Sequence, residues 1–273
     1  MTIKFPVAII LATTSMIFAC SQSEPEATPA PEPAAEPAAA AAPAPEPAAD
    51  LRSMLASDAR SAEDQARDAD RKPADVIEFL GIEPGMAVID VIGAGGYYTE
   101  VLSLAVGTDG SVAAQNPAFV LEMREGANEK ALTARLADNR LPNVTRLNKE
   151  FEELSANDGP FDAAITALNF HDLYNGRSPE AALGVLKTIY SMLKPGGVFG
   201  IIDHAGVADA DNAELHRIEV AKVIETATAA GFVVEGQSSI LSNPEDDHTQ
   251  GVFAEGLRGH TDRFLLKLRK PAE

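Results

Sequence analysis

Apolar residues recur with two different periods along the chain from residue 61 onward, and this pattern predicts alternating helices and strands. Short apolar runs predict strands at 87–91, 111–115, 144–147, 161–168 and 198–202, with a sixth beginning at 232–234 and a seventh at 264–268. Longer stretches with apolar side chains three and four positions apart predict helices at 61–80, 98–106, 119–137, 179–193 and 213–230.

Glycine and proline mark several of the boundaries. Pro73 is suited to begin a second helix within 61–80, and Gly81 is suited to end it. A turn at 107–110 precedes the second strand, and the Lys-Pro-Gly-Gly turn at 194–197 separates a helix from the most apolar strand. These turn signals support the elements that the periodicity predicts.

The order of the elements predicts a fold class. Strands that alternate with helices form a doubly wound, largely parallel sheet of the Rossmann-like α/β type. The last two strands are joined by the polar segment 242–262, which shows no clear crossover helix, so we expect an antiparallel hairpin. Residues 51–273 are therefore predicted to form one Rossmann-like domain with a seven-stranded sheet and an antiparallel C-terminal hairpin.

The first fifty residues differ in composition and are expected to serve export. Lys4 and the apolar stretch 5–19 precede Cys20, the only cysteine of the chain. This pattern resembles the lipobox of bacterial lipoproteins, which implies a signal peptide at 1–19 and lipidation of Cys20. Residues 20–50 are rich in Pro, Ala and Glu and predict a disordered tether. An ordinary signal peptide followed by an unmodified cysteine is the alternative.

These features predict where the protein lies and what it contacts. We expect an exported, periplasmic protein that touches the membrane only through a lipid at Cys20, and Ser21 is typical of sorting to the outer membrane. The formal net charge of −19 and the lack of a basic cluster argue against a nucleic-acid partner. The sequence does not predict an oligomeric state.

The residues between the first strand and the next helix suggest a ligand site. Gly93, Gly95 and Gly96 follow Asp90, the acidic residue near the end of that strand. Glycines let the backbone approach a ligand closely, and free amide groups at the start of a helix attract a carboxylate or a phosphate. A tight turn without any ligand is the alternative interpretation.

Polar residues also end the fourth and fifth predicted strands. Asn169 and His171 alternate where the fourth strand ends, and Asp203 and His204 end the fifth. Neighbouring parallel strands would bring these four side chains to one crevice. Histidine suits a general base near neutral pH, so these residues are the candidate catalytic groups.

Histidine and aspartate at strand ends also raise the question of a metal. His216, His248 and His260 could add to such a cluster. The chain has no His-x-x-x-His pair and no cysteine that could complete a zinc site, so structural hydrogen bonding is the preferred interpretation. We predict no metal site.

Several short motifs occur together across nearly the whole domain. They are Arg-Asp-Ala at 67–69, Arg-Lys-Pro at 71–73, Gly-Gly-Tyr-Tyr-Thr at 95–99, Asn-Phe-His-Asp at 169–172, Leu-Lys-Pro-Gly-Gly at 193–197, Asp-His at 203–204, Leu-His-Arg-Ile at 215–218, Asn-Pro at 243–244, Asp-Asp at 246–247, Arg-Gly at 258–259 and Thr-Asp at 261–262. This combination resembles a family of exported, uncharacterised bacterial proteins of the class I S-adenosylmethionine (SAM)-dependent methyltransferase type. The resemblance implies the fold and SAM as cofactor, but no particular substrate.

The resemblance also implies roles for the turn after the first strand. Asp90, Gly93, Gly95, Gly96 and Tyr98 are expected to hold the methionine part of the cofactor. In class I methyltransferases the acidic residue is usually followed by three alternating glycines.

This chain departs from that pattern at two of the three glycine positions. Counted from the acidic residue, the positions are Ile92, Ala94 and Gly96. The resemblance further implies a carboxylate after the second strand to bind the ribose hydroxyls, whereas this chain has Asn116 there. Asn116 can both donate and accept hydrogen bonds, and a helix cap before Pro117 is its alternative role.

The sequence thus predicts an enzyme that transfers a methyl group from SAM to a small-molecule acceptor, with Asn169, His171, Asp203 and His204 near the transferred group. The alternative is a non-catalytic exported envelope protein that keeps this fold and binds another ligand. The predicted C-terminal hairpin argues against a nicotinamide-dependent enzyme, and the lack of a Gly-x-Ser-x-Gly elbow argues against a hydrolase.

Overall fold

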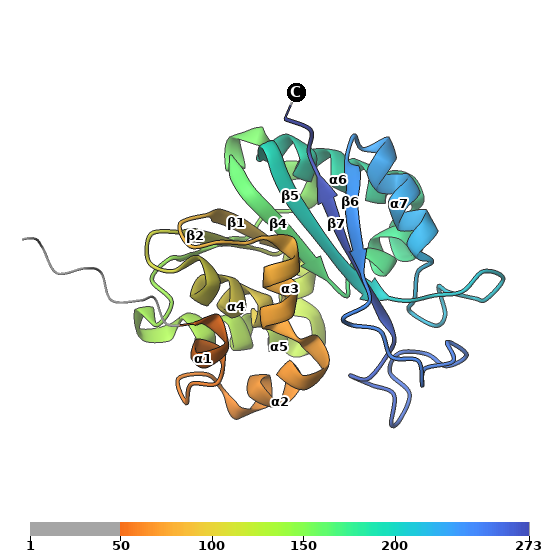
Figure 1. Cartoon of the computed structure of the whole chain (residues 1–273), viewed down its shortest axis with the longest axis horizontal. Coiled ribbons are helices and arrows are strands. Elements are labelled where there is room, and N and C mark those ends of the chain that lie inside the picture. Colours follow the sequence, from red (N-terminus) through yellow and green to blue (C-terminus); the bar gives the residue numbers. More distant parts are fainter. Residues whose placement is uncertain (1–49, 273) are drawn as a thin grey trace, which may run out of the picture. The chain divides into compact units, whose positions relative to one another are not determined.

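A seven-stranded mixed sheet forms the centre of the domain in the computed structural model, with the strand order β3-β2-β1-β4-β5-β7-β6 (Figure 1). Strands β1 to β5 are parallel to one another, and β7 runs antiparallel to both β5 and β6. The strands are β1 (Ala87–Val91), β2 (Ser111–Gln115), β3 (Val144–Leu147), β4 (Phe161–Ala167), β5 (Leu193–His204), β6 (Val233–Ser238) and β7 (Arg263–Arg269). The predicted Rossmann-like sheet with an antiparallel C-terminal hairpin is confirmed.

Helices cover both faces of this sheet (Figure 1). They are α1 (Leu51–Leu55), α2 (Ala62–Arg71), α3 (Pro73–Leu80), α4 (Tyr97–Val106), α5 (Ala118–Leu136), α6 (Pro179–Met192) and α7 (Val220–Ala229). Short helical turns occur at η1 (Ala137–Asn139), η2 (Phe151–Glu153), η3 (Ala156–Asp158) and η4 (Asp172–Arg177). Pro73 begins α3 and Gly81 ends it in a left-handed conformation, as expected from the sequence.

The alternation of side chains along each strand produces two apolar cores. Val88 of β1 and Ile165 of β4 pack with residues of α1, α3 and α4. Ile89 and Ala164, which point the other way, pack with residues of α6 and α7. Burying both faces explains why the central strands read as continuous apolar runs.

The helix predicted at 213–230 begins only at Val220. Residues before it make contacts that a helix would not allow. The backbone amide of Ile218 donates to the carbonyl of His204 at 3.1 Å, and the Ile218 carbonyl accepts from Gly206 at 2.9 Å. Arg217 is fully buried and donates to Asp246 at 2.9 Å. Distant partners therefore override the local helical pattern.

Two other boundaries also differ from the prediction. The helix predicted at 119–137 is interrupted at 123–126, where Arg124, Glu125 and Gly126 adopt left-handed conformations. Strand β5 begins at Leu193 rather than at 198, because Leu193 pairs with Phe161 of β4 before the glycine turn.

The structure describes residues 50–272, which belong to a unit that spans Ala48–Glu273. The predicted signal peptide, Cys20 and nearly all of the predicted tether lie outside the described residues. Within residues 50–272, none of the helices is long and apolar enough to span a membrane.

Candidate functional site

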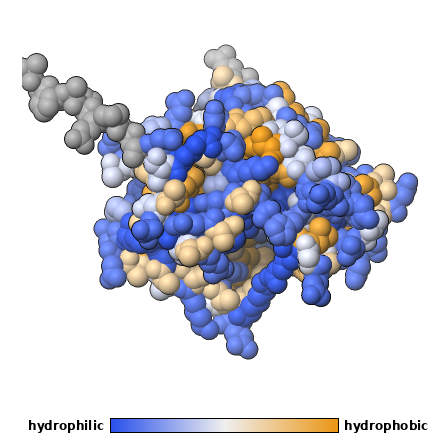
Figure 2. All heavy atoms as spheres, turned by 60° about the horizontal axis from the view of Figure 1, so that its bottom comes forward, coloured by the Kyte–Doolittle hydropathy of each residue, from blue (hydrophilic) through white to orange (hydrophobic). Residues whose placement is uncertain are grey.

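A cavity of about 810 Å³ opens at the carboxyl ends of β1, β4 and β5. This is the edge at which doubly wound sheets bind their ligands. Figure 2 shows the lower side of Figure 1, and hydrophilic residues predominate on it. The side chains that line the cavity come from α2, the turn after β1, the second half of α5, the end of β4 and the segment 252–263.

The turn after β1 adopts the backbone shape that glycine prefers at each of the three expected positions. The φ angles are 57° at Ile92, 50° at Ala94 and 87° at Gly96. A left-handed conformation is unfavourable by about 1–2 kcal/mol for each of Ile and Ala. The fold therefore keeps the conformation of the glycine motif although two of its glycines are absent.

The end of β2 holds this turn in place. The backbone amide of Ile92 donates to the side-chain carbonyl of Gln115 at 3.1 Å, and the amide of Gly93 donates to the Gln115 backbone carbonyl at 3.0 Å. The amide of Ala94 donates to Asn116 Oδ1 at 2.8 Å. These three amides therefore position the turn and are not free to bind an anion.

Asn116 has neither of the two roles proposed from the sequence. Its side chain is fully buried, and both polar atoms bind the backbone of Ala94, with Nδ2 donating to the carbonyl oxygen at 3.5 Å. Helix α5 follows Pro117 without a side-chain cap from Asn116. Asn116 therefore supports the turn from behind and does not line the cavity.

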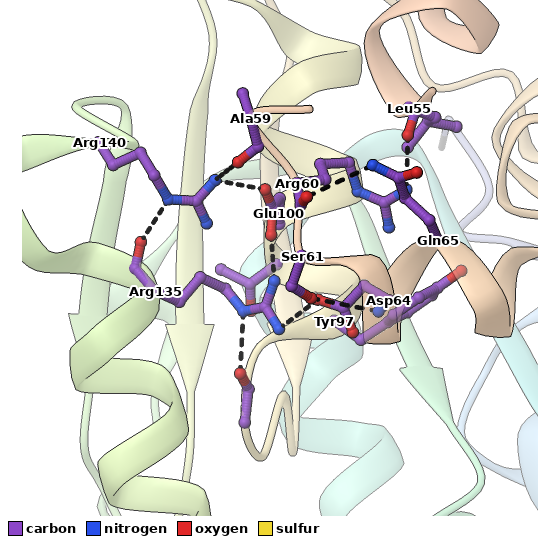
Figure 3. A network of polar contacts seen from close by, with 12 residues as sticks. Leu55, Ala59, Arg60, Ser61, Asp64, Gln65, Tyr97, Glu100, Arg135 and Arg140 are labelled. Atoms are coloured by element: carbon purple, nitrogen blue, oxygen red, sulfur yellow. Dashed lines mark hydrogen bonds and ion pairs between the residues drawn. The ribbon is translucent and has the colours of Figure 1, made fainter. Parts of the chain in front are cut away.

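A buried network of ion pairs supports the turn from its other side (Figure 3). The Glu100 carboxylate accepts hydrogen bonds from Arg135 and Arg140. Arg135 also pairs with Asp64 at 2.7 Å and donates to the carbonyl of Gly95 at 3.0 Å. The network thus connects α2, α4 and α5 around the turn.

One of the five predicted cofactor residues in the turn, Gly96, faces packed protein and does not line the cavity. A Cβ added at Gly96 would lie 2.9 Å from Leu132 Cδ1 and 3.0 Å from Arg135 Cδ, so this glycine allows α5 to pack closely. Gly93, Gly95, Asp90 and Tyr98 do line the cavity, but a Cβ at Gly93 would lie 2.7 Å from Asp90 Oδ2. Gly93 therefore leaves room for the Asp90 carboxylate.

Asp90 is a buried carboxylic acid at the cavity wall. Thr99 Oγ1 donates to Asp90 Oδ2 at 2.6 Å. Burial raises the pKa of Asp90 to about 7, against the opposing effect of the Thr99 hydrogen bonds. A cation bound next to Asp90 would lower this pKa and favour the carboxylate.

Arg71 is a positively charged side chain that lines the same cavity as Asp90. Its guanidinium lies over the ring of Tyr97 at 4.5 Å and over the ring of Tyr98 at 5.9 Å. Burial and the charge of Arg67 lower the pKa of Arg71 to about 10. Within residues 50–272, Arg71 forms no ion pair, whereas Arg67 pairs with Asp64 at 2.9 Å. The cavity thus holds a guanidinium that lacks a carboxylate partner among the described residues.

The four candidate catalytic residues lie together but do not all face the cavity. Asn169 and His204 line it, whereas His171 and Asp203 are buried behind it. Asn169 Nδ2 donates to the backbone carbonyls of Ala167 at 2.8 Å and Ile92 at 3.2 Å. The rings of His171 and His204 lie 5.6 Å apart.

The two histidines have opposite electrostatic environments. Burial lowers the pKa of His204 to about 3, and its Nδ1 pairs with Thr261 Oγ1 at 2.7 Å. Burial also disfavours protonation of His171, but the Asp203 carboxylate, 2.7 Å from His171 Nδ1, outweighs it and raises the pKa of His171. His204 is therefore neutral at the cavity wall, while His171 is the more basic group.

The sequence-based reasoning missed the positive side chains of the cavity. Arg67, Arg71, Arg258 and Arg263 all line it. Arg67, Arg71 and Arg258 lie in short motifs that carried the family resemblance, and Arg263 directly follows another, but spacing alone assigned them no role. Their convergence depends on packing α2 against the segment 252–263.

Comparison with known proteins identifies relatives of this chain. The model of the ubiE/COQ5 methyltransferase family matches residues 69–214, slightly more than half of the chain. A protein of Synechocystis sp. described as an uncharacterized methyltransferase is 29% identical over 127 residues, which cover 46% of this chain and 51% of the relative. A ubiquinone/menaquinone biosynthesis C-methyltransferase of Idiomarina loihiensis is 24% identical over 193 residues, covering 70% of this chain and 66% of the relative. The matched region thus spans about half to two thirds of these relatives.

Solved structures support the fold. A SAM-dependent methyltransferase from Aquifex aeolicus superposes with a TM-score of 0.52 and 22% identity, covering 72% of this chain and 89% of that one. The [4+2]-cyclase SpnF superposes with a TM-score of 0.55 and 18% identity, covering 82% of this chain and 94% of that one. Because a cyclase shares the fold, fold similarity alone does not specify the reaction. The family match decides the assignment: the chain belongs to the ubiE/COQ5 methyltransferase family, and SAM is the cofactor that this membership implies.

Proposed function

We propose that this protein transfers the methyl group of SAM to a small acceptor that carries an anionic group. The observation that carries the cofactor part is that one acidic and one basic side chain, Asp90 and Arg71, line the same cavity and form no ion pair within residues 50–272. The methionine part of SAM has an ammonium group and a carboxylate group. A ligand with both charges would favour the ionised form of each side chain.

The residues of the turn and of α2 therefore fit the cofactor. Asp90 would accept hydrogen bonds from the ammonium group, and Arg71 would donate to the carboxylate. SAM supplies an electrophilic methyl group on a sulfonium centre, so the protein has to position the acceptor in line with it. Gln115, Asn116 and Arg135 contribute by holding the turn in one conformation.

The acceptor side of the cavity lies between the ends of β4 and β5 and the segment 252–263. Asn169, His204 and Phe253 line this part. His204 is too weakly basic, with a pKa of about 3, to keep a proton taken from an acceptor at neutral pH. An acceptor whose reacting group is already ionised needs no such base. This site therefore favours an ionised acceptor.

Arg258 supports an anionic acceptor. Its guanidinium lies 5.9 Å from the centre of the Phe253 ring, and within residues 50–272 it forms no ion pair. A carboxylate or phosphate group on the acceptor would supply the missing partner. His204 Nε2 would then orient the acceptor through a hydrogen bond.

Titration calorimetry of the full chain with SAM and S-adenosylhomocysteine tests the cofactor site. Arg71→Gln should weaken binding about 10- to 100-fold, because one charge-assisted hydrogen bond contributes about 1.5–3 kcal/mol. Arg71→Lys should retain part of the affinity. Arg258→Gln is the matched control and should leave cofactor binding unchanged. Folded wild-type protein that binds neither compound would refute the proposal.

We also propose that the protein is exported and lipidated at Cys20. The support is the sequence alone, namely the apolar stretch 5–19 directly before the cysteine. Mass spectrometry of the mature N-terminus in the native host should show an acylated Cys20. An unmodified Cys20, or a chain that still begins at Met1, would contradict lipidation.

A further inference from the structure

Three potential metal ligands lie together just behind the acceptor side of the cavity. His171 Nε2 and Asp172 Oδ1 are 3.3 Å apart, and His216 Nδ1 is also 3.3 Å from Asp172 Oδ1. All three ligand atoms lie within 4.8 Å of one another. They come from the start of η4, which follows β4, and from the loop before α7, and these segments are separated by more than forty residues in the sequence.

The two distances of 3.3 Å are long for hydrogen bonds and compatible with metal coordination. Hydrogen bonds between nitrogen and oxygen are usually 2.7–3.2 Å long. A tetrahedral zinc ion with Zn–N and Zn–O distances of about 2.0–2.2 Å places neighbouring ligand atoms about 3.3–3.6 Å apart. Both edges that meet at Asp172 Oδ1 therefore already have the spacing that such an ion requires.

Asp203 supplies the outer support that metal-binding histidines usually have. Its Oδ1 lies 2.7 Å from His171 Nδ1, and its Oδ2 accepts from the His171 backbone amide at 2.7 Å. This contact assigns the proton to Nδ1 and leaves the lone pair of Nε2 facing Asp172. A carboxylate bound to the far nitrogen is the arrangement that orients a metal ligand.

His216 is held in place by its neighbour in the chain. Its backbone is left-handed, with a φ angle of 54°. Arg217 fixes this conformation because its guanidinium is fully buried and bound to Asp246 at 2.9 Å and to the carbonyl of Ala205 at 3.0 Å. The unusual backbone at His216 therefore presents its ring to Asp172.

We propose that His171 Nε2, Asp172 Oδ1 and His216 Nδ1 bind one divalent transition-metal ion, with Zn²⁺ preferred, and leave one coordination position open. Two imidazoles and one carboxylate suit such ions. The side chains of Asp172 and His216 are 63% and 42% exposed, so an ion and a fourth ligand can reach them.

The position of this site connects it to the cavity. His216 packs against Phe253 with the ring centres 5.0 Å apart, and Phe253 lines the cavity. The metal would thus tie the loop before α7 to the start of η4 beside the acceptor. The site does not depend on SAM binding, so its test is separate from the test of the proposed function.

The experiment is a Zn²⁺ titration of the full, tag-free chain against a competing chelator, in a Cys20→Ser background so that no thiol competes. His216→Ala and Asp172→Asn are the main variants, because both side chains are exposed and their loss should not prevent folding. His260→Ala is the matched control, since His260 is an exposed histidine 2.9 Å from a single carboxylate, that of Asp70. Circular dichroism checks that every variant is folded.

We expect one Zn²⁺ per chain, bound with unchanged affinity by the control. Removing a residue that only supports a metal ligand costs about 10- to 100-fold in metal affinity. Each main variant removes a ligand itself and should therefore lose more than that. Co²⁺ bound to the wild type should give the visible absorption of a tetrahedral site, and His216→Ala should abolish it. No stoichiometric binding by the folded wild type, or equal binding by wild type, His216→Ala and Asp172→Asn, would overturn the proposal.

Discussion

Replacing Gly93 by alanine tests how the turn after β1 supports the candidate cofactor site. Gly93 does not have a left-handed backbone, so alanine can adopt its conformation. The added Cβ would lie 2.7 Å from Asp90 Oδ2 and 3.1 Å from Thr99 Oγ1. Asp90 is only 2% exposed and has little room to move away. The substitution should therefore displace Asp90 from its hydrogen bond with Thr99.

Two effects on the free energy of unfolding oppose each other. Alanine restricts the unfolded chain and would stabilise the protein by about 0.4–1 kcal/mol. Overpacking next to Asp90 costs about 1–3 kcal/mol. The overpacking term is larger, so we expect a net loss of about 1–2 kcal/mol, which corresponds to about 2–4 °C in Tm per kcal/mol for a domain of this size.

Thermal and urea unfolding followed by circular dichroism measure this change. Gly184→Ala is the matched control, because a Cβ there meets no atom within 4 Å and Gly184 lies inside helix α6. The control should stabilise the protein by about 0.5–1 kcal/mol. Gly93→Ala should also weaken SAM binding, since Asp90 moves. A Gly93→Ala protein as stable as the wild type, with unchanged SAM affinity, would refute the reasoning.

Two further predictions concern the same turn. Ala94→Gly should raise the free energy of unfolding by up to about 1 kcal/mol, because it relieves the left-handed strain at φ 50°. Ile92→Gly should lower the free energy of unfolding by about 2 kcal/mol or more, because Ile92 is only 7% exposed and its buried side chain is lost. Urea unfolding of both variants checks the opposite signs, and a common sign would contradict the account. Burial raises the pKa of Asp90 to about 7 in the folded state, whereas its pKa in the unfolded chain is near 3.8. Asp90 therefore stabilises the protein fully below pH 3.8, and this contribution is lost as the pH rises to about 7. Asp90→Asn should remove this loss, so the Tm of the variant relative to the wild type should rise between about pH 4 and pH 7. A constant Tm difference across that range would argue against a raised pKa of Asp90.

Much of the fold follows from local patterns. Strand β1 and helix α3 have their predicted boundaries, because apolar periodicity and the signals at Pro73 and Gly81 act within a few residues. The antiparallel hairpin was also predictable, since the long segment before β7 has no crossover helix. Asp90 and Gly93 line the cavity, and their place at the end of β1 followed from the sequence because that end has a defined position in this fold.

Features that depend on distant partners could not be read from local patterns. Residues 213–219 have a helical pattern, but the buried Arg217–Asp246 pair and the contact between Ile218 and His204 give them another conformation. Asn116 was expected to bind the ribose, yet it supports Ala94 because the turn after β1 packs directly against the end of β2. In both cases a contact across the fold is stronger than the local preference.

The sequence by itself determined the order of helices and strands, the Rossmann-like topology and the motifs by which the family is recognised. The tertiary structure alone decided which side chains of those motifs meet. Only the packing of α2 against the segment 252–263 brings Arg71 and Arg258 to one cavity, and only the loop held by Arg217 brings His216 to His171. The physical reason is that periodicity reflects which side of an element is buried, whereas a site depends on the distances between atoms that lie far apart in the chain.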